Sequence, residues 1–226
     1  MRKFFEELRI QLNEVQLEKF EKYYQLLIEY NDKFNITAIT EKEEVYKKHF
    51  VDSLYDVDKL ISGNYLDVGS GGGFPAIPIA IMREDINYTL LEATGKKCEF
   101  LSVVIKELNL KNVKVINGRA EEYSLKNEFR EKFTGVSARA VARLNILAEY
   151  CLPFVKIGGF FVAYKGDVDS ELNEALNAFS VLGGELKSVD KTELFGAKRA
   201  VVFVKKIKPT EKKYPRSNGK IRKSPL

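Results

Sequence analysis

The protein is poor in residues that bind metals or form disulfides. It contains one histidine, His49, and two cysteines, Cys98 and Cys151. The cysteines lie far apart in the sequence, form no C-x-x-C pair and have no cluster of histidines beside them. These shortages argue against a structural zinc site and against a disulfide framework. We expect two reduced, partly buried thiols in a protein that binds no metal.

Long apolar runs are also missing. No stretch of about 18 apolar residues occurs, which is the length that a membrane helix requires. Residues 1–11 mix charged and apolar side chains, unlike the apolar centre of a signal peptide. We therefore expect a cytoplasmic protein without a membrane segment. Its 226 residues, 45% hydrophobic and 31% charged, suit a globular protein with one main domain and an elaboration.

Positive charge is concentrated near the C-terminus. After Val204 the sequence has nine Lys and Arg residues and one acid, Glu211, so that this segment carries +8. The first 204 residues therefore carry −3 of the total charge of +5. Such a segment is typical of proteins with a polyanionic partner. The alternative is a disordered, solubilising tail, because the sequence after Pro209 has too little apolar content to fold alone.

The pattern of apolar residues divides the chain into three parts. Residues 1–62 predict a helical extension, with apolar residues at helical spacing and a capping box from Thr40 to Glu43. Residues 63–207 predict the main domain, in which short apolar runs alternate with amphipathic helices around a parallel sheet. Residues 208–226 form the basic tail.

The main domain predicts seven strands with helices between most of them. The expected strands cover residues 65–68, 88–91, 113–116, 133–137, 159–164, 186–189 and 200–205. The expected helices cover residues 75–82, 96–108, 145–154 and 172–182. This order indicates an α/β fold of the Rossmann-like, seven-stranded class I methyltransferase type, in which the last strand runs antiparallel.

A glycine-rich turn follows the first strand and precedes a helix. It reads Asp67-x-Gly69-x-Gly71-x-Gly73, and glycines here let a ligand approach bare backbone. A dinucleotide fingerprint would need glycine at position 74, which is Phe74, and the lysine of a P-loop is absent. The spacing is instead typical of sites that bind S-adenosylmethionine.

The ends of the next two strands carry matching signals. Glu92 ends the second strand about 20 residues after the turn, where an acid accepts hydrogen bonds from ribose hydroxyls. Its alternative interpretation is a solvated glutamate at a strand end. Residues 117–121 follow the third strand, where an adenine edge usually meets the backbone. The turn and Glu92 together indicate a nucleoside site more strongly than either does alone.

Beyond these motifs, the sequence resembles the RsmG (GidB) family of bacterial small-subunit ribosomal RNA guanine-N7 methyltransferases. The matching segments are residues 34–39, 48–54, 69–78, 137–142, 165–166, 196–199, 212–216 and 223–226. Ala76, Gly73 and Thr134 depart from the residues usual in the family. The glycine turn and the resemblance together predict S-adenosylmethionine contacts at Gly69, Ser70, Gly71, Gly73, Phe74, Glu92, Ala93, Thr94, Ala120, Glu121 and Arg139.

The resemblance implies methyl transfer to N7 of a guanine in 16S ribosomal RNA, either naked or in the small ribosomal subunit. Guanine N7 carries an exposed lone pair, so no general base is needed, and no catalytic residue is assigned. Arg139, Lys165 and Arg199 are the candidates for positioning, in a protein expected to be a monomer. The alternatives are a Rossmann-like methyltransferase acting on another RNA or a small molecule, and a non-catalytic module that binds RNA or a nucleotide.

Several residues near these motifs have a structural interpretation as well. Arg139 could cap a helix or pair with Glu121 instead of binding a ligand. A histidine facing a helical core is more often structural than functional, so the sequence assigns such roles to His49, Asp52 and Asp56. The aromatic residues that could stack on a base, although each is more often part of a core, are Phe74, Tyr164 and Phe195.

Overall fold

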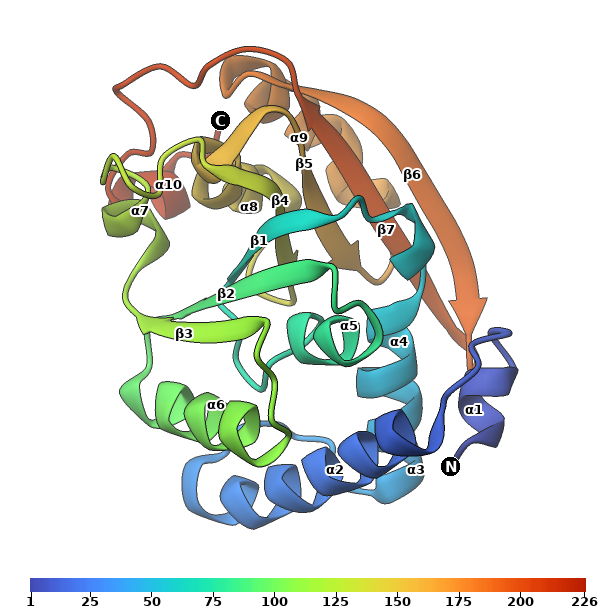
Figure 1. Cartoon of the computed structure of the whole chain (residues 1–226). Coiled ribbons are helices and arrows are strands. Elements are labelled where there is room, and N and C mark those ends of the chain that lie inside the picture. Colours follow the sequence, from blue (N-terminus) through green and yellow to red (C-terminus); the bar gives the residue numbers. More distant parts are fainter.

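A computed structural model describes residues 1–226 and confirms the seven-stranded α/β fold (Figure 1). The strand order is β3-β2-β1-β4-β5-β7-β6. β7 runs antiparallel to both of its neighbours, and the other strands are parallel to one another. The strands are β1 (Gly63–Val68), β2 (Ile86–Glu92), β3 (Val113–Asn117), β4 (Phe133–Arg139), β5 (Val155–Lys165), β6 (Gly184–Leu194) and β7 (Ala197–Lys206).

The strand order reverses direction beside β1. The chain moves from β1 outward to β2 and β3, and then returns to the other side of β1 with β4 and β5. Open α/β sheets bind ligands at such a switch point, beyond the carboxyl ends of the strands. Because β7 is antiparallel, its first residues reach this same edge, where Ala200 pairs with Lys165. The edge therefore gathers residues from almost the entire chain.

Helices cover both faces of the sheet (Figure 1). One face carries α5 and α6, against which the first helices of the chain pack, and the other carries α8 and α9 with the short α7 and α10. The sheet thus separates two apolar cores, each of which fills one of these layers. These helices are α5 (Ala76–Met82), α6 (Gly95–Glu107), α7 (Ala120–Tyr123), α8 (Leu144–Cys151), α9 (Asp169–Val181) and α10 (Asn218–Lys223).

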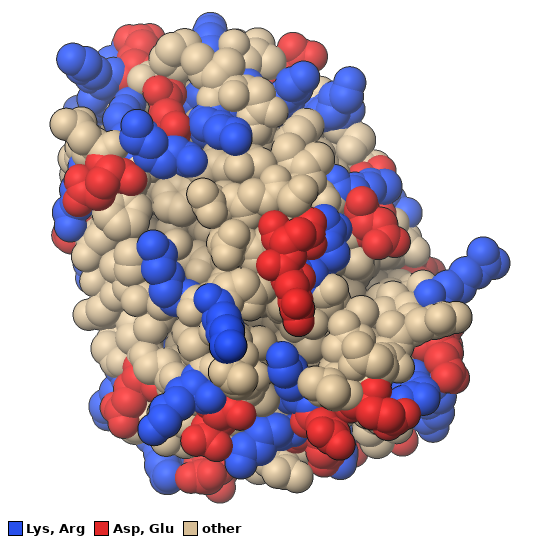
Figure 2. All heavy atoms as spheres, viewed as in Figure 1, with Lys and Arg blue, Asp and Glu red and all other residues tan.

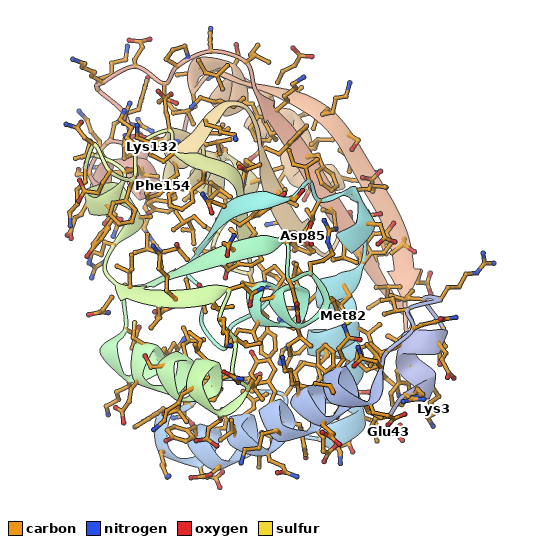
Figure 3. The ribbon with its side chains drawn as sticks, viewed as in Figure 1. Lys3, Glu43, Met82, Asp85, Lys132 and Phe154 are labelled. Carbon is orange, nitrogen blue, oxygen red and sulfur yellow. The ribbon has the colours of Figure 1, made fainter.

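The N-terminal segment forms an outer layer over α5 and α6. Its elements are α1 (Lys3–Glu6), α2 (Glu14–Phe34), α3 (Lys42–Val45), a π-helical turn (Tyr46–Val51) and α4 (Asp52–Leu54). Lys3 of α1 lies beside Glu43 of α3, at an N···O distance of 3.9 Å (Figure 3). Buried aromatic rings join this layer to the glycine turn, since Tyr23 of α2 stacks on Phe74 at 5.5 Å between ring centroids.

The predicted capping box from Thr40 to Glu43 is wrong. The helix begins one residue later, because the carboxylate of Glu41 accepts the backbone N–H of Glu44 at 3.0 Å. A capping box exists instead at the start of α2, where the Asn13 side chain accepts the N–H of Gln16 at 2.8 Å. Both caps satisfy amide donors that a helix start leaves unpaired.

Two helices were absent from the expected elements, α7 and α10. α10 lies in the basic tail and buries Ile221 completely, so the tail gains a helix by packing on the main domain rather than by folding alone. Several strands are also longer than expected, above all β6 with 11 residues, because its polar residues continue the pairing with β7. No helix combines the length and the apolar character that crossing a bilayer requires.

Candidate functional site

The glycine turn has the backbone geometry that its sequence requires. Gly69, Gly71 and Gly73 have φ angles of +69°, +56° and +92°, in the region that side chains disfavour. The N–H of Gly69 donates to the carbonyl of Leu91 at 2.8 Å, which fixes the turn against the end of β2. The turn and the residues after β2 therefore form one surface.

Glu92 is the side chain that organises this surface. Its Oε2 accepts the N–H of Gly71 at 2.9 Å, and its Oε1 accepts the N–H of Thr94 at 2.8 Å. The side chain is only 6% exposed, so it is not the solvated strand-end glutamate of the alternative interpretation. A carboxylate has about four acceptor positions, and two of them remain for a ligand here.

A cavity of about 120 Å³ lies over the carboxyl ends of β1, β2 and β3. We call it the small cavity. Its lining includes four of the predicted cofactor residues, which are Gly69, Ala93, Ala120 and Glu121. It also includes three residues that the sequence did not indicate, Tyr150 of α8 and Asn218 and Arg222 of α10.

Seven of the predicted cofactor residues do not line the small cavity. Gly71, Glu92 and Thr94 are joined by hydrogen bonds at the turn, and Arg139 lines a different cavity, described below. The other three are Ser70, Gly73 and Phe74. Ser70 is 2% exposed, and its Oγ donates to the carbonyl of Asp67 at 3.0 Å. A Cβ on Gly73 would lie 2.7 Å from the hydroxyl oxygen of Tyr23, so this glycine lets α2 approach the turn. Phe74 stacks on the ring of His49 at 4.5 Å between centroids. Gly73 and Phe74 attach the N-terminal layer to the turn, and Ser70 braces the turn from within. The contact of these three residues with a cofactor stays a prediction.

Asp67 lies beneath the turn and is almost completely buried. Its Oδ1 accepts the hydroxyl of Ser137 at 2.6 Å, while Oδ2 has no hydrogen-bond partner. Burial raises the pKa of this carboxyl to about 7, against the opposing effect of the bonds from Ser137 and Ser70. The first acid of the motif is therefore a structural support under the turn, with a charge that changes near neutral pH.

A second cavity, of about 310 Å³, lies between the N-terminal helices and the ends of β4 and β5. We call it the large cavity. Four cationic side chains line it, and Asp52 is its only acid. The cations are Lys48, Arg139, Lys165 and Arg199, which include all three candidates for positioning.

Arg139 and Arg199 share the carboxylate of Asp52. Nη1 of Arg139 lies 3.1 Å from Oδ2 of Asp52, and Nε of Arg199 donates to Oδ1. The predicted alternative partner of Arg139, Glu121, is wrong, because Glu121 lines the small cavity on the other side of the segment after β4. Two guanidinium groups on one carboxylate leave a net positive charge in the large cavity.

The structure places His49 and Asp52 in the wall of the large cavity. The sequence predicted only a structural role for both. Nη2 of Arg139 lies 3.2 Å from Nδ1 of His49. Because a guanidinium only donates, Nδ1 accepts, and Nε2 carries the hydrogen that it shares with Thr37 Oγ1 at 2.8 Å. Burial, and then the charge of Arg139, lowers the pKa of His49 to about 3.

The spacing of these two residues is a signal that sequence reasoning could have used. His49 and Asp52 lie three residues apart on the helical segment, so their side chains share a face. Asp56, the third residue set aside, does not line the cavity and pairs with Lys59 at 2.8 Å. What the sequence did not reveal is that the shared face turns toward Arg139 at the end of β4.

The other candidates divide between the cavity and the core. Tyr164 and Lys165 line the large cavity at the end of β5. Nζ of Lys165 donates to the carbonyl of Ala142 at 3.0 Å and pairs with Glu171 at 2.8 Å. Phe195 lines neither cavity and packs edge-on against Phe4 at 6.1 Å, so a stacking role for Phe195 has no support.

The segment after β4 separates the two cavities. Arg139 and Ala140 line the large cavity, and Val141 lines the small one. Val141 covers the turn so closely that a Cβ on Gly69 would lie 2.8 Å from its Cγ2. A ligand that contacts the Gly69 backbone would therefore displace this side chain. No group of three His, Cys, Asp or Glu side chains is arranged to hold a metal ion.

Comparison with known proteins gives matches over nearly the full length of the chain. The family model of rRNA small subunit methyltransferase G matches residues 16–219. A ribosomal RNA small subunit methyltransferase G from Clostridium perfringens is 44% identical, covering 100% of this chain and 97% of that protein. The protein of that name from Desulforamulus reducens is 47% identical, covering 97% of this chain and 94% of its own length.

Solved structures share the fold at much lower identity. Aeropyrum pernix fibrillarin, solved with natively bound S-adenosyl-L-methionine, has a TM-score of 0.52 at 16% identity and covers 63% of this chain and 66% of that one. A geranyl diphosphate C-methyltransferase from Streptomyces coelicolor has a TM-score of 0.54 at 14% identity, covering 69% and 78%. By its extended match at high identity, the chain belongs to the rRNA small subunit methyltransferase G family.

Proposed function

We propose that this protein transfers a methyl group from S-adenosylmethionine to N7 of a guanine in 16S ribosomal RNA. The single observation that carries the proposal is the family match over residues 16–219, joined to two adjoining cavities at the switch point of the sheet. The small cavity receives the methyl donor and the large cavity the RNA. The protein works in the cytoplasm as a monomer, without a metal ion.

The residues around the small cavity suit the methyl donor. Glu92 is held by two backbone amides and has acceptor positions left for the two ribose hydroxyls. Gly71 has open space beside its backbone and can meet the amino acid part. Gly69, Ala120 and Glu121 line the cavity, the last two where the adenine edge would be. S-adenosylmethionine supplies a methyl group on a positively charged sulfur, which the protein has only to orient.

The large cavity suits an anionic substrate that needs no deprotonation. Arg139 and Arg199 share one carboxylate and so leave the cavity the positive charge to bind an RNA phosphate. Guanine N7 attacks with its own lone pair, so rate enhancement comes from alignment and from excluding water. His49 is not available as a general base, because Thr37 and Arg139 occupy both of its ring nitrogens. It holds Arg139 in place instead, which agrees with a reaction that needs no deprotonation.

The proposal is tested by methyl transfer from labelled S-adenosylmethionine. The acceptors are naked 16S ribosomal RNA and small ribosomal subunits from cells that lack this enzyme, followed by mapping of the modified base. We expect label at N7 of one guanine. The control is Asp167→Asn, which removes an acid whose only ion pair, with Lys198, is exposed. Cofactor binding without transfer to either RNA, or transfer only to small molecules, would contradict the proposal.

A further inference from the structure

The basic C-terminal segment is locked to the body of the protein. Glu149 of α8 is 1% exposed, and its carboxylate accepts from Arg216 Nε at 2.9 Å and from Arg216 Nη2 at 2.6 Å. Arg130 donates to the backbone carbonyls of Thr210, Glu211 and Tyr214. A buried, bidentate pair and three carbonyl contacts fix the path of this segment, so α10 has a defined position.

That position is beside the small cavity and away from the large one. α10 packs on α8, next to α7 (Figure 1), and Asn218 and Arg222 line the small cavity together with Ala93 and Ala120. None of the nine basic residues after Val204 lines the large cavity. Figure 2 shows Lys and Arg side chains, with Asp and Glu among them, at the upper left of the molecule, where Figure 1 places α7 and α10. A broad uncharged surface lies beside them in the centre.

The side chains of α10 are oriented by α8. The hydroxyl of Tyr150 donates to Oδ1 of Asn218 at 2.5 Å, and Nε of Arg222 donates to the same oxygen at 3.2 Å. Since a guanidinium has no acceptor, the oxygen of the Asn218 amide must face Arg222. Nδ2 of Asn218 has no partner within the chain, and it remains a donor for a ligand.

The order of the strands decides which part of the ligand meets α10. β2 lies between β1 and β3, so a nucleoside with its ribose at Glu92 would place its amino acid part at the turn after β1 and its base toward β3. The residues after β3, Ala120 and Glu121, share the small cavity with α10. Adenine offers ring nitrogens that accept hydrogen bonds and a flat face on which a guanidinium stacks.

We propose that α10 forms one wall of the adenosine pocket, with Asn218 and Arg222 contacting the adenine of S-adenosylmethionine. This inference rests on the proposed function, because it takes the methyl donor as the ligand. It also changes the role expected of the basic tail. Arg222 serves the cofactor and Arg216 is held by Glu149, so that exposed lysines such as Lys220 and Lys223 are left for a polyanion.

The test is binding of S-adenosylhomocysteine, measured by calorimetry on the full chain. Arg222→Ala and Asn218→Ala are compared with Lys220→Ala and Lys223→Ala, exposed positions on the same helix that do not line the cavity. We expect about tenfold weaker binding in the first pair, as for a lost hydrogen bond to a buried partner, and no more than about twofold in the second. Equal melting temperatures would show that all four variants retain the fold.

A second ligand locates the contact. 5′-Methylthioadenosine lacks the amino acid part, so the first pair should lose the same factor with it as with S-adenosylhomocysteine. A loss limited to S-adenosylhomocysteine, or unchanged binding in both variants, would overturn the inference alone. The inference would also be overturned if Arg222→Ala left nucleoside binding unchanged and weakened RNA binding only as much as Lys220→Ala does. An unaltered protein that binds neither nucleoside would overturn the proposed function and this inference with it.

Discussion

The small and large cavities meet at the segment after β4, but their walls have different origins. Most of the small cavity consists of residues that directly follow β1, β2 and β3, with α10 added at one side. The large cavity gathers residues from Ile39 to Val201, and helices of the N-terminal layer face strand ends across it. The small cavity is thus built mainly by strand ends, whereas the large cavity exists only when distant layers pack together.

Their charges differ in the same way. Beside the small cavity, the buried carboxylate of Glu92 is held by the backbone amides of Gly71 and Thr94. The large cavity depends on side-chain pairs, with Asp52 between Arg139 and Arg199. Backbone donors keep their geometry when one side chain changes, but a shared carboxylate does not. Substitutions should therefore separate cofactor binding from RNA methylation.

The largest expected effect is on cofactor binding, from Glu92→Ala. This change removes the acceptor for the ribose and leaves the N–H groups of Gly71 and Thr94 unpaired. Two lost hydrogen bonds to a charged group cost about 3 kcal/mol, or about a hundredfold in affinity. Calorimetry with S-adenosylhomocysteine measures the loss.

The matched control is Glu122→Ala, an exposed acid of α7 that does not line the small cavity. It should bind S-adenosylhomocysteine like the unaltered protein. Wild-type affinity in Glu92→Ala would show that the small cavity does not hold the ribose.

A smaller effect, confined to the large cavity, is expected from Asp52→Asn. The amide cannot hold Arg139 and Arg199 together, and a buried ion pair that loses one partner is strongly destabilising. We expect methyl transfer to fall at least about tenfold and the free energy of unfolding to fall by about 3 kcal/mol. Binding of S-adenosylhomocysteine should stay unchanged. Transfer assays, urea unfolding and calorimetry measure the three quantities.

The comparison is Asp167→Asn, whose pair with Lys198 is exposed and contributes little to stability. If Asp52→Asn lost cofactor affinity as strongly as activity, the two cavities would not be separable.

The smallest effect is on the pH dependence of stability, to which His49 and Asp67 contribute in opposite directions. Unfolded His49 takes up a proton below pH 6.5, but the folded pKa is about 3, so stability falls as the pH falls through 6.5 toward 3. Asp67 acts in the opposite direction. Its pKa is about 7 when folded and 3.8 when unfolded, so its protonation stabilises the fold as the pH falls from 7 toward 4.

Substitution of either His49 or Asp67 should leave the pH dependence of the unfolding free energy that the remaining residue causes. Between pH 7 and pH 5, Asp67→Asn should lose about 2 kcal/mol more stability than the unaltered protein, and His49→Gln should gain relative to it. Urea unfolding at the two pH values measures both. NMR offers a direct check, because the single histidine should show no titration between pH 8 and pH 5. A His49 signal that titrates near pH 6.5 would contradict its burial against Arg139.

The sequence predicted the small cavity better than the large one for a physical reason. Glycines, a strand and a following acid lie within one βαβ unit, so the spacing of Gly69 and Glu92 carries the geometry. Pairs such as Asp52 with Arg199, 147 residues apart, depend on how the N-terminal layer docks. No local pattern records that docking. Periodicity therefore found the strands. Their ends, together with the resemblance, drew attention to Arg139, Lys165 and Arg199, but not to the carboxylate that two of them share.

The same limit applies to the tail. Its composition predicts that it does not fold alone. Composition does not show that Glu149 pairs with Arg216 or that Arg130 donates to three carbonyls of the tail. Burial of Ile221 then supplies the apolar contact that a short helix needs. A segment with few apolar residues can be well ordered when a finished domain presents partners to it.

The direction of β7 has a consequence for the route of the chain. Because this strand is antiparallel, it starts near Arg199 at the ligand edge and delivers the backbone to the far edge at Lys206. Residues 207–217 must then travel back across the molecule before α10 can return to the ligand edge. Cleavage within residues 207–217 would leave the sheet and the N-terminal layer intact. It would remove the covalent connection that holds Arg222 at the small cavity.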